Sequence, residues 1–392
     1  MSEQNTQLIS FLESSRAAFI ADLADLVNRD CGTEDKPGVD RVARWFEQRC
    51  AQWGYAVQTL PQPHYGDNVV ARITGNGTAR IMLIGHLDTV YPIGTAAKRP
   101  MQIIGDKILG PGTCDIKGGL LVGLYAVRAL QHIGFDDFAE MVFFFNSEEE
   151  VGSPVSQHVY SPIAKNMDAV LVLEAARANG DIVGARKGVG NYRLHVRGKA
   201  AHAGVEPEKG ANAILELAYC IAALHALNGI APGVTVNAGV IGGGTRPNVV
   251  PEAAWVDVDV RAIDMVGANA IKQAIADLAQ QPAQVRGTIV EVTGGFGFMP
   301  MSKTKAIAGL VELAQASARE LGFEVNAAAT GGVSDANKMA ELGVPVLDGL
   351  GPVGGLDHGP DEYIEQSSIV PRTALLALLM QKIATNRKTK NP

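Results

Sequence analysis

Residues 81–90 read IMLIGHLDTV, an apolar run followed by a glycine and then by His86 and Asp88. A short apolar run of this kind is typical of a strand buried on both faces of a sheet. Because side chains alternate along a strand, His86 and Asp88 point the same way. A carboxylate placed there can accept the free ring N–H of the imidazole, which leaves the other ring nitrogen able to bind a metal ion. Any His-x-Asp spacing allows this, so the stretch alone leaves a structural role open.

Similar apolar runs recur along the first half of the chain. They predict strands at 55–59, 68–73, 79–85, 139–146 and 168–174. Apolar residues at helical spacing predict helices at 4–28, at 38–53 and from near Lys117. Strands that alternate with helices indicate an α/β sheet covered on both faces, and ligands of such sheets gather beyond the carboxyl ends of the strands.

The pattern changes from about residue 187. The expected order becomes strand, helix, strand, strand, helix and strand, at 190–197, 210–228, 233–241, 254–262, 267–281 and 286–293. This βαββαβ order is ferredoxin-like, and its alternating strands suit a sheet with one wet face. The buried α/β pattern returns after about residue 296, with a last helix from about 368. We therefore expect one α/β domain, 1–186 and 296–392, interrupted by a smaller domain at 187–295.

Composition limits the class of protein. The chain has 392 residues, of which 47% are hydrophobic and 19% charged, as in an ordinary globular protein of two domains. A net charge of −7, with Lys and Arg scattered, argues against nucleic acid or an anionic membrane as a partner. The first residues lack a secretory pattern and no long apolar run follows, so we expect a cytoplasmic protein. The absence of a C-x-x-C pair predicts free, buried thiols at Cys31, Cys50, Cys114 and Cys220.

Acidic residues follow two of the expected strands. The segment NSEEEVGS places Glu149 and Glu150 after the strand at 139–146, and Glu174 ends the run DAVLVLE. Three successive acids would be costly to bury without a cation, whereas an exposed loop would tolerate them. Both interpretations stay open from these residues alone.

Two glycine-rich loops carry further ligand types. Asp115 lies in GTCDIKGG, where glycines allow the backbone to turn sharply, although an Asp at this place also suits a helix N-cap. His358 lies in GPVGGLDHGPDE, which also reads as a surface loop. Taken together, two histidines and several acids fit two divalent ions that share one carboxylate. Nitrogen and oxygen ligands without cysteine are compatible with Zn²⁺, Co²⁺ or Mn²⁺.

Six motifs follow one another in an order that resembles a known enzyme family. They are GHLDTV, GPGTCDIKGG, NSEEEVGS, LE at 173–174, RGKAAHAG and LDHGPDE. Over essentially its whole length the chain resembles the dinuclear zinc peptidases and deacylases of the glutamate carboxypeptidase, acetylornithine deacetylase, succinyl-diaminopimelate desuccinylase and aminoacylase family. It is most similar to the glutamate carboxypeptidase-like members. The resemblance implies a zinc-peptidase-like α/β/α catalytic domain with an inserted ferredoxin-like lid or dimerisation domain.

The resemblance also implies two Zn²⁺ ions per subunit. It makes His86, Asp115 and Glu174 the ligands of one ion. Asp115, Glu150 and His358 would hold the other ion, so that Asp115 bridges the two.

Two further roles near this centre follow from the same resemblance. Asp88 would orient His86, and Glu149 would be the general base that activates water and later protonates the leaving amine. A cis peptide is implied between Asp115 and Ile116.

The inserted domain contributes residues of its own. His202 in KAAHAGVEP resembles the family's lid histidine, which polarises the scissile carbonyl in its own or in the neighbouring subunit. Asn248 and Arg261 match positions that bind substrate carbonyl or carboxylate groups, and Arg246 and Lys187 are assigned to substrate on the same basis. A lone arginine on a strand is commonly a solvated edge charge, so these roles depend on the resemblance.

One position departs from the family pattern. Carboxypeptidase-like members carry an arginine after the last lid strand that grips the terminal carboxylate of the substrate, whereas this chain reads TGGFGFMPM and places Phe298 there. An aromatic ring cannot replace a bidentate carboxylate partner. We therefore expect an apolar or aromatic acyl group near Phe298, with the carboxylate left to Arg261 and Asn248.

The sequence thus predicts a metal-dependent hydrolase that cleaves the amide bond of a small N-acyl amino acid or dipeptide-like substrate. A deacetylase or desuccinylase of amino-acid metabolism is the alternative, and a non-catalytic binding relative is a third reading. The lid sheet has an exposed edge and its helix at 210–228 is apolar on more than one face, which predicts a homodimer through the lid.

Overall fold

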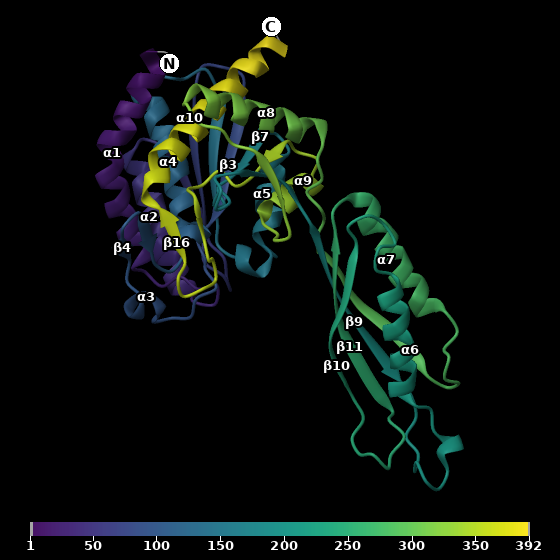
Figure 1. Cartoon of the computed structure of the whole chain (residues 1–392). Helices are drawn as coiled ribbons and strands as arrows, with labels where there is room; N and C mark the ends of the chain where they lie inside the picture. The colour runs from purple at the N-terminus through teal and green to yellow at the C-terminus, as the bar shows by residue number, and fades with distance from the viewer. Residues whose placement is uncertain (1–2, 391–392) are drawn as a thin grey trace. The chain divides into compact units, whose positions relative to one another are not determined.

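The computed structural model describes residues 3–390 and separates into two compact units (Figure 1). The first unit holds the chain up to Ala185, then Lys303–Thr330, and the residues from Ser334 onward. The inserted unit holds Arg186–Ser302 and Gly331–Val333. It runs past the expected limit of 295 because its last strand is longer than the sequence pattern indicated.

A six-stranded mixed sheet forms the centre of the first unit, in the order β1-β2-β6-β3-β7-β14. Its strands are Ala56–Leu60 (β1), Asn68–Thr74 (β2), Arg80–His86 (β3), Glu140–Asn146 (β6), Ala169–Val172 (β7) and Val346–Leu347 (β14). β3 runs parallel to both β6 and β7, so the carboxyl ends of these three strands lie at one edge of the sheet. The mixed α/β architecture expected from the sequence is confirmed.

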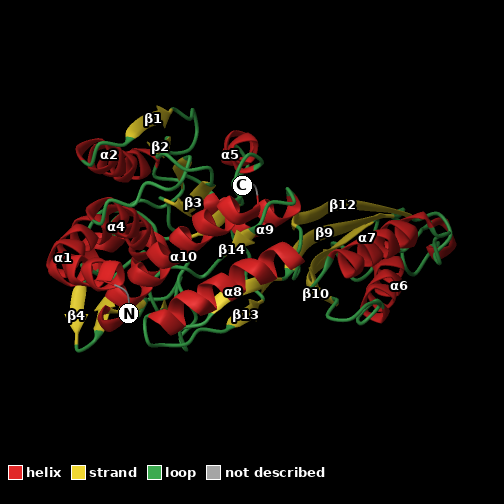
Figure 2. Cartoon of the chain, turned by 90° about the horizontal axis from the view of Figure 1, so that it is seen from above, coloured by secondary structure: helices red, strands yellow, loops and turns green. Residues whose placement is uncertain are grey.

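Helices cover both faces of this sheet (Figure 2). One face carries α1 (Glu3–Val27), α2 (Lys36–Gln52), α4 (Gly118–His132), α8 (Lys305–Glu320) and α10 (Ile369–Lys390), and the other carries α5 (Ser156–Ala164) and α9 (Asp335–Glu341). Successive side chains of β6 point to opposite faces of the sheet. Phe145 stacks on Phe46 of α2, whereas Phe144 packs edge-on against Tyr160 of α5. Strands buried in this way on both faces are continuously apolar.

A small four-stranded sheet, β15-β16-β5-β4, joins distant parts of the first unit. Its strands are Gln102–Ile104 (β4), Lys107–Leu109 (β5), Gly354–Gly355 (β15) and Tyr363–Glu365 (β16). Leu109 pairs with Tyr363, which brings the glycine-rich segment after β5 close to the loop before β16. The remaining short elements of this unit are α3 (Thr95–Lys98), β8 (Ile182–Arg186), β13 (Ala327–Thr330), and the turns η1 (Thr113–Lys117), η2 (Glu149–Val151) and η4 (Gln366–Ser368).

The inserted unit is an antiparallel sheet with two helices. Its elements are β9 (Gly188–Arg197), η3 (Pro207–Lys209), α6 (Ala213–Ala226), β10 (Thr235–Gly243), β11 (Ala253–Ala262), α7 (Met265–Gln280) and β12 (Ile289–Phe298). The strand order β10-β11-β9-β12 is that of a ferredoxin-like fold, as expected. Inward-facing apolar residues of the sheet and of both helices, among them Leu194, Val256 and Ile271, form a second core.

Phe298 belongs to β12, not to a segment after it. The expected strand ended at 293 because TGGFG reads as a turn, yet pairing with β9 continues through a register shift between Phe296 and Phe298. Phe298 lies opposite Val189 and is partly buried.

The four cysteines are free and buried, as the sequence predicted. Among the described residues, no helix combines the length and apolar character that crossing a membrane requires.

Candidate active site

The edge where β3, β6 and β7 end gathers the polar residues that the sequence singled out. His86 is the last residue of β3, Glu149 and Glu150 form the turn after β6, and Glu174 follows β7. Asp115 reaches the same place from the glycine-rich segment after β5.

Asp115 presents one carboxylate oxygen to each of two histidines. Its Oδ1 lies 2.9 Å from His86 Nε2, and its Oδ2 lies 2.9 Å from His358 Nε2. Glu174 Oε1 lies 3.8 Å from His86 Nε2, and Glu150 Oε2 lies 3.4 Å from His358 Nε2. The structure thus forms two groups of nitrogen and oxygen donors that share Asp115.

The donor set fits a pair of divalent cations. Ligand atoms of His86, Asp115 and Glu150 all lie within 4.8 Å of one another. Glu150 Oε1 is buried without a hydrogen-bond partner among the described residues, and a buried carboxylate oxygen of this kind needs a cation or a donor. The set holds no thiolate, so its chemistry suits Zn²⁺, Co²⁺ or Mn²⁺.

Neighbouring acids raise the pKa of both histidines. Burial would lower the pKa of His86, but hydrogen bonds to Asp115 and Asp88 raise this pKa well above its ordinary value. The contacts of His358 with Asp115 and Glu150 raise its pKa to about 11. Because a histidine must be neutral to bind a metal ion, cations and protons compete for this site.

Asp88 contacts both His86 and the acidic turn after β6. His86 Nδ1 lies 3.0 Å from the main-chain oxygen of Asp88 and 3.3 Å from its carboxylate. The carboxylate also accepts hydrogen bonds from the Thr33 hydroxyl at 2.7 Å and from the main-chain N–H groups of Glu149 and Glu150 at 3.1 and 3.3 Å. One buried acid therefore fixes both the histidine and the acidic turn.

The three successive acids are divided between two roles. Glu148 is fully buried and turned toward α5, where it accepts from the Val155 and Ser156 N–H groups at 3.0 and 2.6 Å. Glu149 and Glu150 remain at the edge of the sheet. Burial raises the pKa of Glu149; His86 opposes this shift and nearby acids, Asp335 first, reinforce it.

Sequence reasoning missed Glu362, the last residue of the quoted motif LDHGPDE. Its buried carboxylate accepts from the main-chain N–H groups of Gly112, Cys114 and Asp115 at 2.9, 2.8 and 3.0 Å. It also accepts from the Tyr91 hydroxyl at 2.7 Å. This residue fixes the backbone that carries Asp115, and the acid at the end of the motif was the signal available. The peptide between Asp115 and the next residue is cis, as the resemblance implied.

Glycines allow the backbone around Glu174 to pack closely. A Cβ atom at Gly119 of α4 would lie 1.8 Å from the Leu173 main-chain oxygen. A Cβ atom at Gly351 would lie 2.8 Å from that oxygen and 2.9 Å from the Glu174 oxygen, and the Gly351 N–H donates to the latter at 2.8 Å. Glu174 is thus fixed by main-chain contacts on both sides.

The other assigned residues belong to the inserted unit. Lys187 lies between β8 and β9 and is partly buried. His202, Arg246 and Asn248 are exposed in two adjoining loops. The Ala203 N–H donates to the Asn248 oxygen at 3.0 Å, so the structure brings the His202 and Asn248 segments together within this unit.

Arg261 is already engaged by a neighbour. Its Nε and Nη2 donate to the Asp259 carboxylate, each at 2.8 Å, and its Nη1 donates to the Gly331 oxygen at 3.3 Å. The guanidinium expected to bind substrate therefore has a carboxylate partner within the chain.

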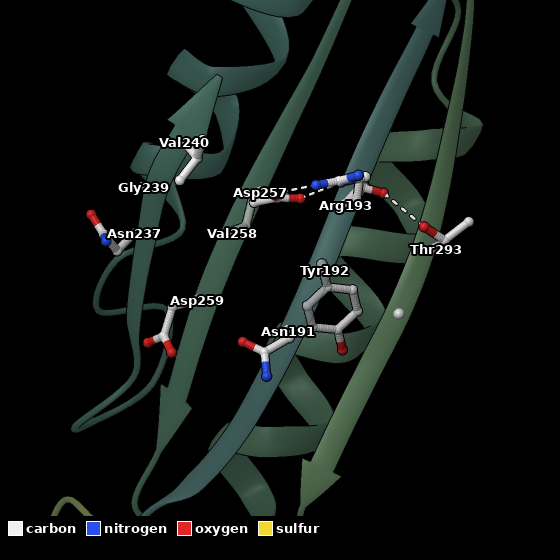
Figure 3. Close-up of a pocket in the computed structure, with 11 residues that line it drawn as sticks. Asn191, Tyr192, Arg193, Asn237, Gly239, Val240, Asp257, Val258, Asp259 and Thr293 are labelled. Atoms are coloured by element: carbon white, nitrogen blue, oxygen red, sulfur yellow. Dashed lines mark hydrogen bonds and ion pairs between the residues drawn. The ribbon is translucent and has the colours of Figure 1, made fainter. Parts of the chain in front are cut away.

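A hollow of about 420 Å³ lies on the sheet of the inserted unit (Figure 3). Its lining includes Asn191, Asn237 and Asp259, and Arg193 is paired there with Asp257. It contains none of the residues assigned from the sequence, and the charge of Arg193 is neutralised by Asp257. A smaller pocket of about 200 Å³ in the first unit is lined by Asp115 and Glu174, and this one coincides with the predicted chemistry.

Comparison with known families matches residues 82–382 to peptidase family M20/M25/M40. The chain belongs to this family. Carboxypeptidase G2 of Pseudomonas sp. (strain RS-16) is 30% identical over 390 residues, which cover 98% of this chain and 94% of that protein. Acetylornithine deacetylase of Proteus mirabilis (strain HI4320) is 23% identical, with 98% of this chain and 100% of that protein covered.

Solved structures agree with the fold. The aminopeptidase PepT of Bacillus cereus superposes with a TM-score of 0.75 at 23% identity, covering 94% of this chain and 99% of that one. A dinuclear metal-binding peptidase of the M20 family from Bacillus subtilis superposes with a TM-score of 0.68 at 14% identity, covering 95% of this chain and 99% of that one. The protein is thus a metal-dependent hydrolase of peptidase or amidohydrolase type, as the sequence predicted.

Proposed function

We propose that this hydrolase cleaves the amide bond of a small N-acyl amino acid or dipeptide-like substrate. The observation that carries the proposal is the position of Asp115, which offers one oxygen to the His86 and Glu174 group and the other to the His358 and Glu150 group. Two carboxylate–histidine groups around one shared acid suit a pair of ions.

In this proposal two Zn²⁺ ions, or Co²⁺ or Mn²⁺ as substitutes, are held by His86, Asp115, Glu150, Glu174 and His358. Ions bound there supply Lewis-acid activation of water and of the scissile carbonyl. Glu149 takes the proton from the attacking water and delivers it to the leaving amine. The raised pKa of Glu149 supports this role, because a carboxylate of raised pKa is a stronger base toward the proton of water. Asp88 holds His86 and the turn that carries Glu149 in place.

Residues of the inserted unit are also assigned to the substrate in this proposal. His202 polarises the scissile carbonyl, Asn248 and Arg246 bind polar groups of the substrate, and Phe298 contacts an apolar or aromatic acyl group. Lys187 and Arg261 belong to the same site, although the pairing of Arg261 with Asp259 reduces what its guanidinium can offer.

We also propose a homodimer formed through the inserted unit. Ile214, Leu215 and Tyr219 of α6 and Val240 and Ile241 of β10 are exposed, and β10 is an edge strand. Apolar residues beside an unpaired strand edge favour association with a second copy. Four free buried cysteines suit a reducing compartment, which supports a cytoplasmic location.

Two variants test the roles of adjacent acids. Glu149→Ala is expected to bind two metal ions and to melt like the wild type while kcat falls by about 10²-fold or more. Glu150→Ala should instead bind fewer ions and recover part of its activity when metal is supplied in excess. Metal content after dialysis and turnover of N-acyl amino acids are the measurements. A Glu149→Ala enzyme that loses metal but keeps its turnover would overturn the assignment.

A substrate panel separates the two hydrolase readings. N-acyl amino acids with apolar acyl groups should be cleaved faster than N-acetylornithine or N-succinyl-diaminopimelate, because Phe298 offers an aromatic face and no charge. The reverse order would favour the deacylase of amino-acid metabolism.

A further inference from the structure

One arginine of the first unit lines the pocket that contains Asp115 and Glu174, and no role has been given to it so far. This residue is Arg177, three positions after Glu174. The pocket has a volume of about 200 Å³, and its walls include the small residues Ala175 and Gly354. Among the described residues that line it, Arg177 is the one with a cationic side chain.

The Arg177 side chain has donors to spare. Its Nη2 donates to the Ala175 main-chain oxygen at 3.2 Å. Its Nε is buried and has no hydrogen-bond acceptor among the residues that the structure describes. The backbone at this position is fixed as well, since the Arg177 N–H donates to the Asp181 oxygen at 3.0 Å and the Gly180 N–H donates to the Arg177 oxygen at 2.7 Å. The Nε atom is too deeply buried for a ligand in the pocket to reach, but Nη1 has no hydrogen-bond partner among the described residues either. The Nη end of the guanidinium is therefore suited to an acceptor brought by a ligand.

Three acids line the pocket, Asp115, Glu174 and Asp357, and none of them forms an ion pair with Arg177 among the described residues. Both oxygens of Asp115 face histidines, and Glu174 lies beside His86. Within the described part of the chain, Arg177 forms no ion pair within 4.0 Å, whereas Arg261 is held by the Asp259 carboxylate. Of these two arginines, Arg177 is the one that is not already paired with a carboxylate, so its Nη groups can donate to one.

We propose that Arg177 binds the α-carboxylate of the substrate and thereby sets the preference for N-acyl amino acids over their amides. The inference rests on the proposed function. It names the α-carboxylate because this is the one anion that every N-acyl amino acid carries, whatever its side chain. It also explains how the chain can lack an arginine at position 298 and still select a carboxylate, since Arg177 supplies the guanidinium from a different element.

The test compares matched substrates, an N-acyl-alanine and the corresponding N-acyl-alaninamide, with the zinc-loaded enzyme. Arg177→Met should lower kcat/KM for the acid by about 10- to 100-fold, which is the value of one charge-assisted hydrogen bond. It should lower kcat/KM for the amide by no more than about threefold. Arg177→Lys, which keeps the charge without the fork, should fall between wild type and Arg177→Met on the acid.

Arg193→Met is the matched control, because its guanidinium is paired with Asp257 and no role in the site is assigned to it. It should change the ratio of acid to amide by less than about threefold. The inference is overturned if Arg177→Met weakens acid and amide equally, or if the acid-specific loss appears in Arg193→Met instead. Metal content and melting temperature are recorded for each variant, and a loss of metal that accounts for the whole effect on the acid likewise overturns it.

Binding separates this inference from the proposed function. Calorimetric titration of Glu149→Ala, with and without Arg177→Met, measures the affinity for the acid and for the amide without turnover. If the wild type cleaves neither substrate but Arg177→Met weakens binding of the acid alone, the proposed function fails and the assignment of Arg177 stands. If the acid and the amide bind alike in both proteins, the assignment of Arg177 fails.

Discussion

Asp115 is held by contacts along its backbone as well as at its carboxylate. Glu362 accepts its N–H, while His86 and His358 face the two carboxylate oxygens. Burial would raise the pKa of Asp115, but the hydrogen bonds with His358 and His86 hold this pKa far below its ordinary value. The acid therefore stays ionised, which a carboxylate that bridges two cations requires.

Glu362→Gln tests the backbone contact. An amide presents an NH₂ group to main-chain N–H donors that now meet a carboxylate, so the segment around Asp115 should shift. We expect metal affinity to fall by about 10- to 100-fold, the usual effect of disturbing groups behind the ligands. Competition with a chelator measures it. Glu365→Gln on β16 is the control, and equal affinities in the two variants would contradict the role of Glu362.

Metal loading should release protons. The raised pKa of His358, about 11, keeps this histidine protonated in the metal-free enzyme at pH 7.5, whereas in the unfolded chain it is mostly neutral above its ordinary value of 6.5. The proton therefore stabilises the metal-free fold. This stabilisation is complete below about pH 6.5, falls as the pH rises between the two values and is lost above about 11. Binding of Zn²⁺ must expel the proton, so apparent affinity should rise with pH.

Titration of metal-free enzyme with Zn²⁺ in a weak buffer measures this release directly. His358→Gln should release fewer protons per ion bound than the wild type. Release that is zero, or unchanged by the substitution, would contradict the raised pKa of His358.

At the scale of elements, the start of α4 and the segment after β7 are in direct main-chain contact. Gly119 leaves no room for a side chain against the Leu173 oxygen, and Gly351 is similarly close to Leu173 and Glu174. The direction in which Glu174 leaves the sheet is therefore set by how closely these segments approach. Helix packing and ligand position are coupled at this place.

Gly119→Ala should separate these segments. The added methyl group cannot fit without a backbone shift, so we expect a loss of about 1–3 kcal/mol of stability together with weaker metal binding. Gly309→Ala in α8 is the matched control, because nothing lies within 4 Å of its added Cβ and alanine is the better helix former. Thermal unfolding with and without metal checks both variants. A Gly119→Ala protein as stable as the wild type would refute the close contact.

The sequence predicted the long elements and failed on the short paired ones. Continuous apolar runs such as 139–146 fixed the central strands, because burial on both faces leaves no other pattern. The sheet of β4, β5, β15 and β16 was not expected, since strands of two or three residues carry no periodicity. The last strand was cut short at 293 because glycine is common in turns, and only the pairing with β9 shows that it continues.

Some residues of the site could be predicted from the sequence and others could not, because only some of them lie in a recognisable motif. His86 and Asp115 lie in motifs with distinctive residue types, so their meeting could be expected. Arg177 gave no periodic or spacing signal, and Glu362 gave only its place at the end of the motif LDHGPDE. The contacts of both side chains appear only in the fold. The ion pair of Arg261 with Asp259 was also missed, although the two residues are only two positions apart in the chain.

At the scale of the whole molecule, the exposed apolar residues of the inserted unit predict the oligomeric state. Light scattering at micromolar concentration should give a dimer, and Ile241→Glu on β10 should shift it toward monomer because a charge there opposes edge pairing. Val266→Glu on α7, at an equally apolar and exposed residue, is the control. A wild-type monomer would contradict the proposal.

Complementation extends this test to the site. If His202 serves the partner's centre, mixing the inactive Glu149→Ala and His202→Ala subunits should restore part of the activity. Without such recovery from a confirmed dimer, His202 would act within its own subunit.

The contact between His358 and Asp115 joins residues that are 243 positions apart, with the whole inserted unit between them. During synthesis a ribosome therefore releases the first four of the five proposed ligands long before the fifth. A nascent chain, or one truncated within or just after the inserted unit, exposes an acid-rich edge that cannot yet close around cations. A chain that ends before residue 358 therefore holds at most four of the five proposed ligands and cannot complete the centre.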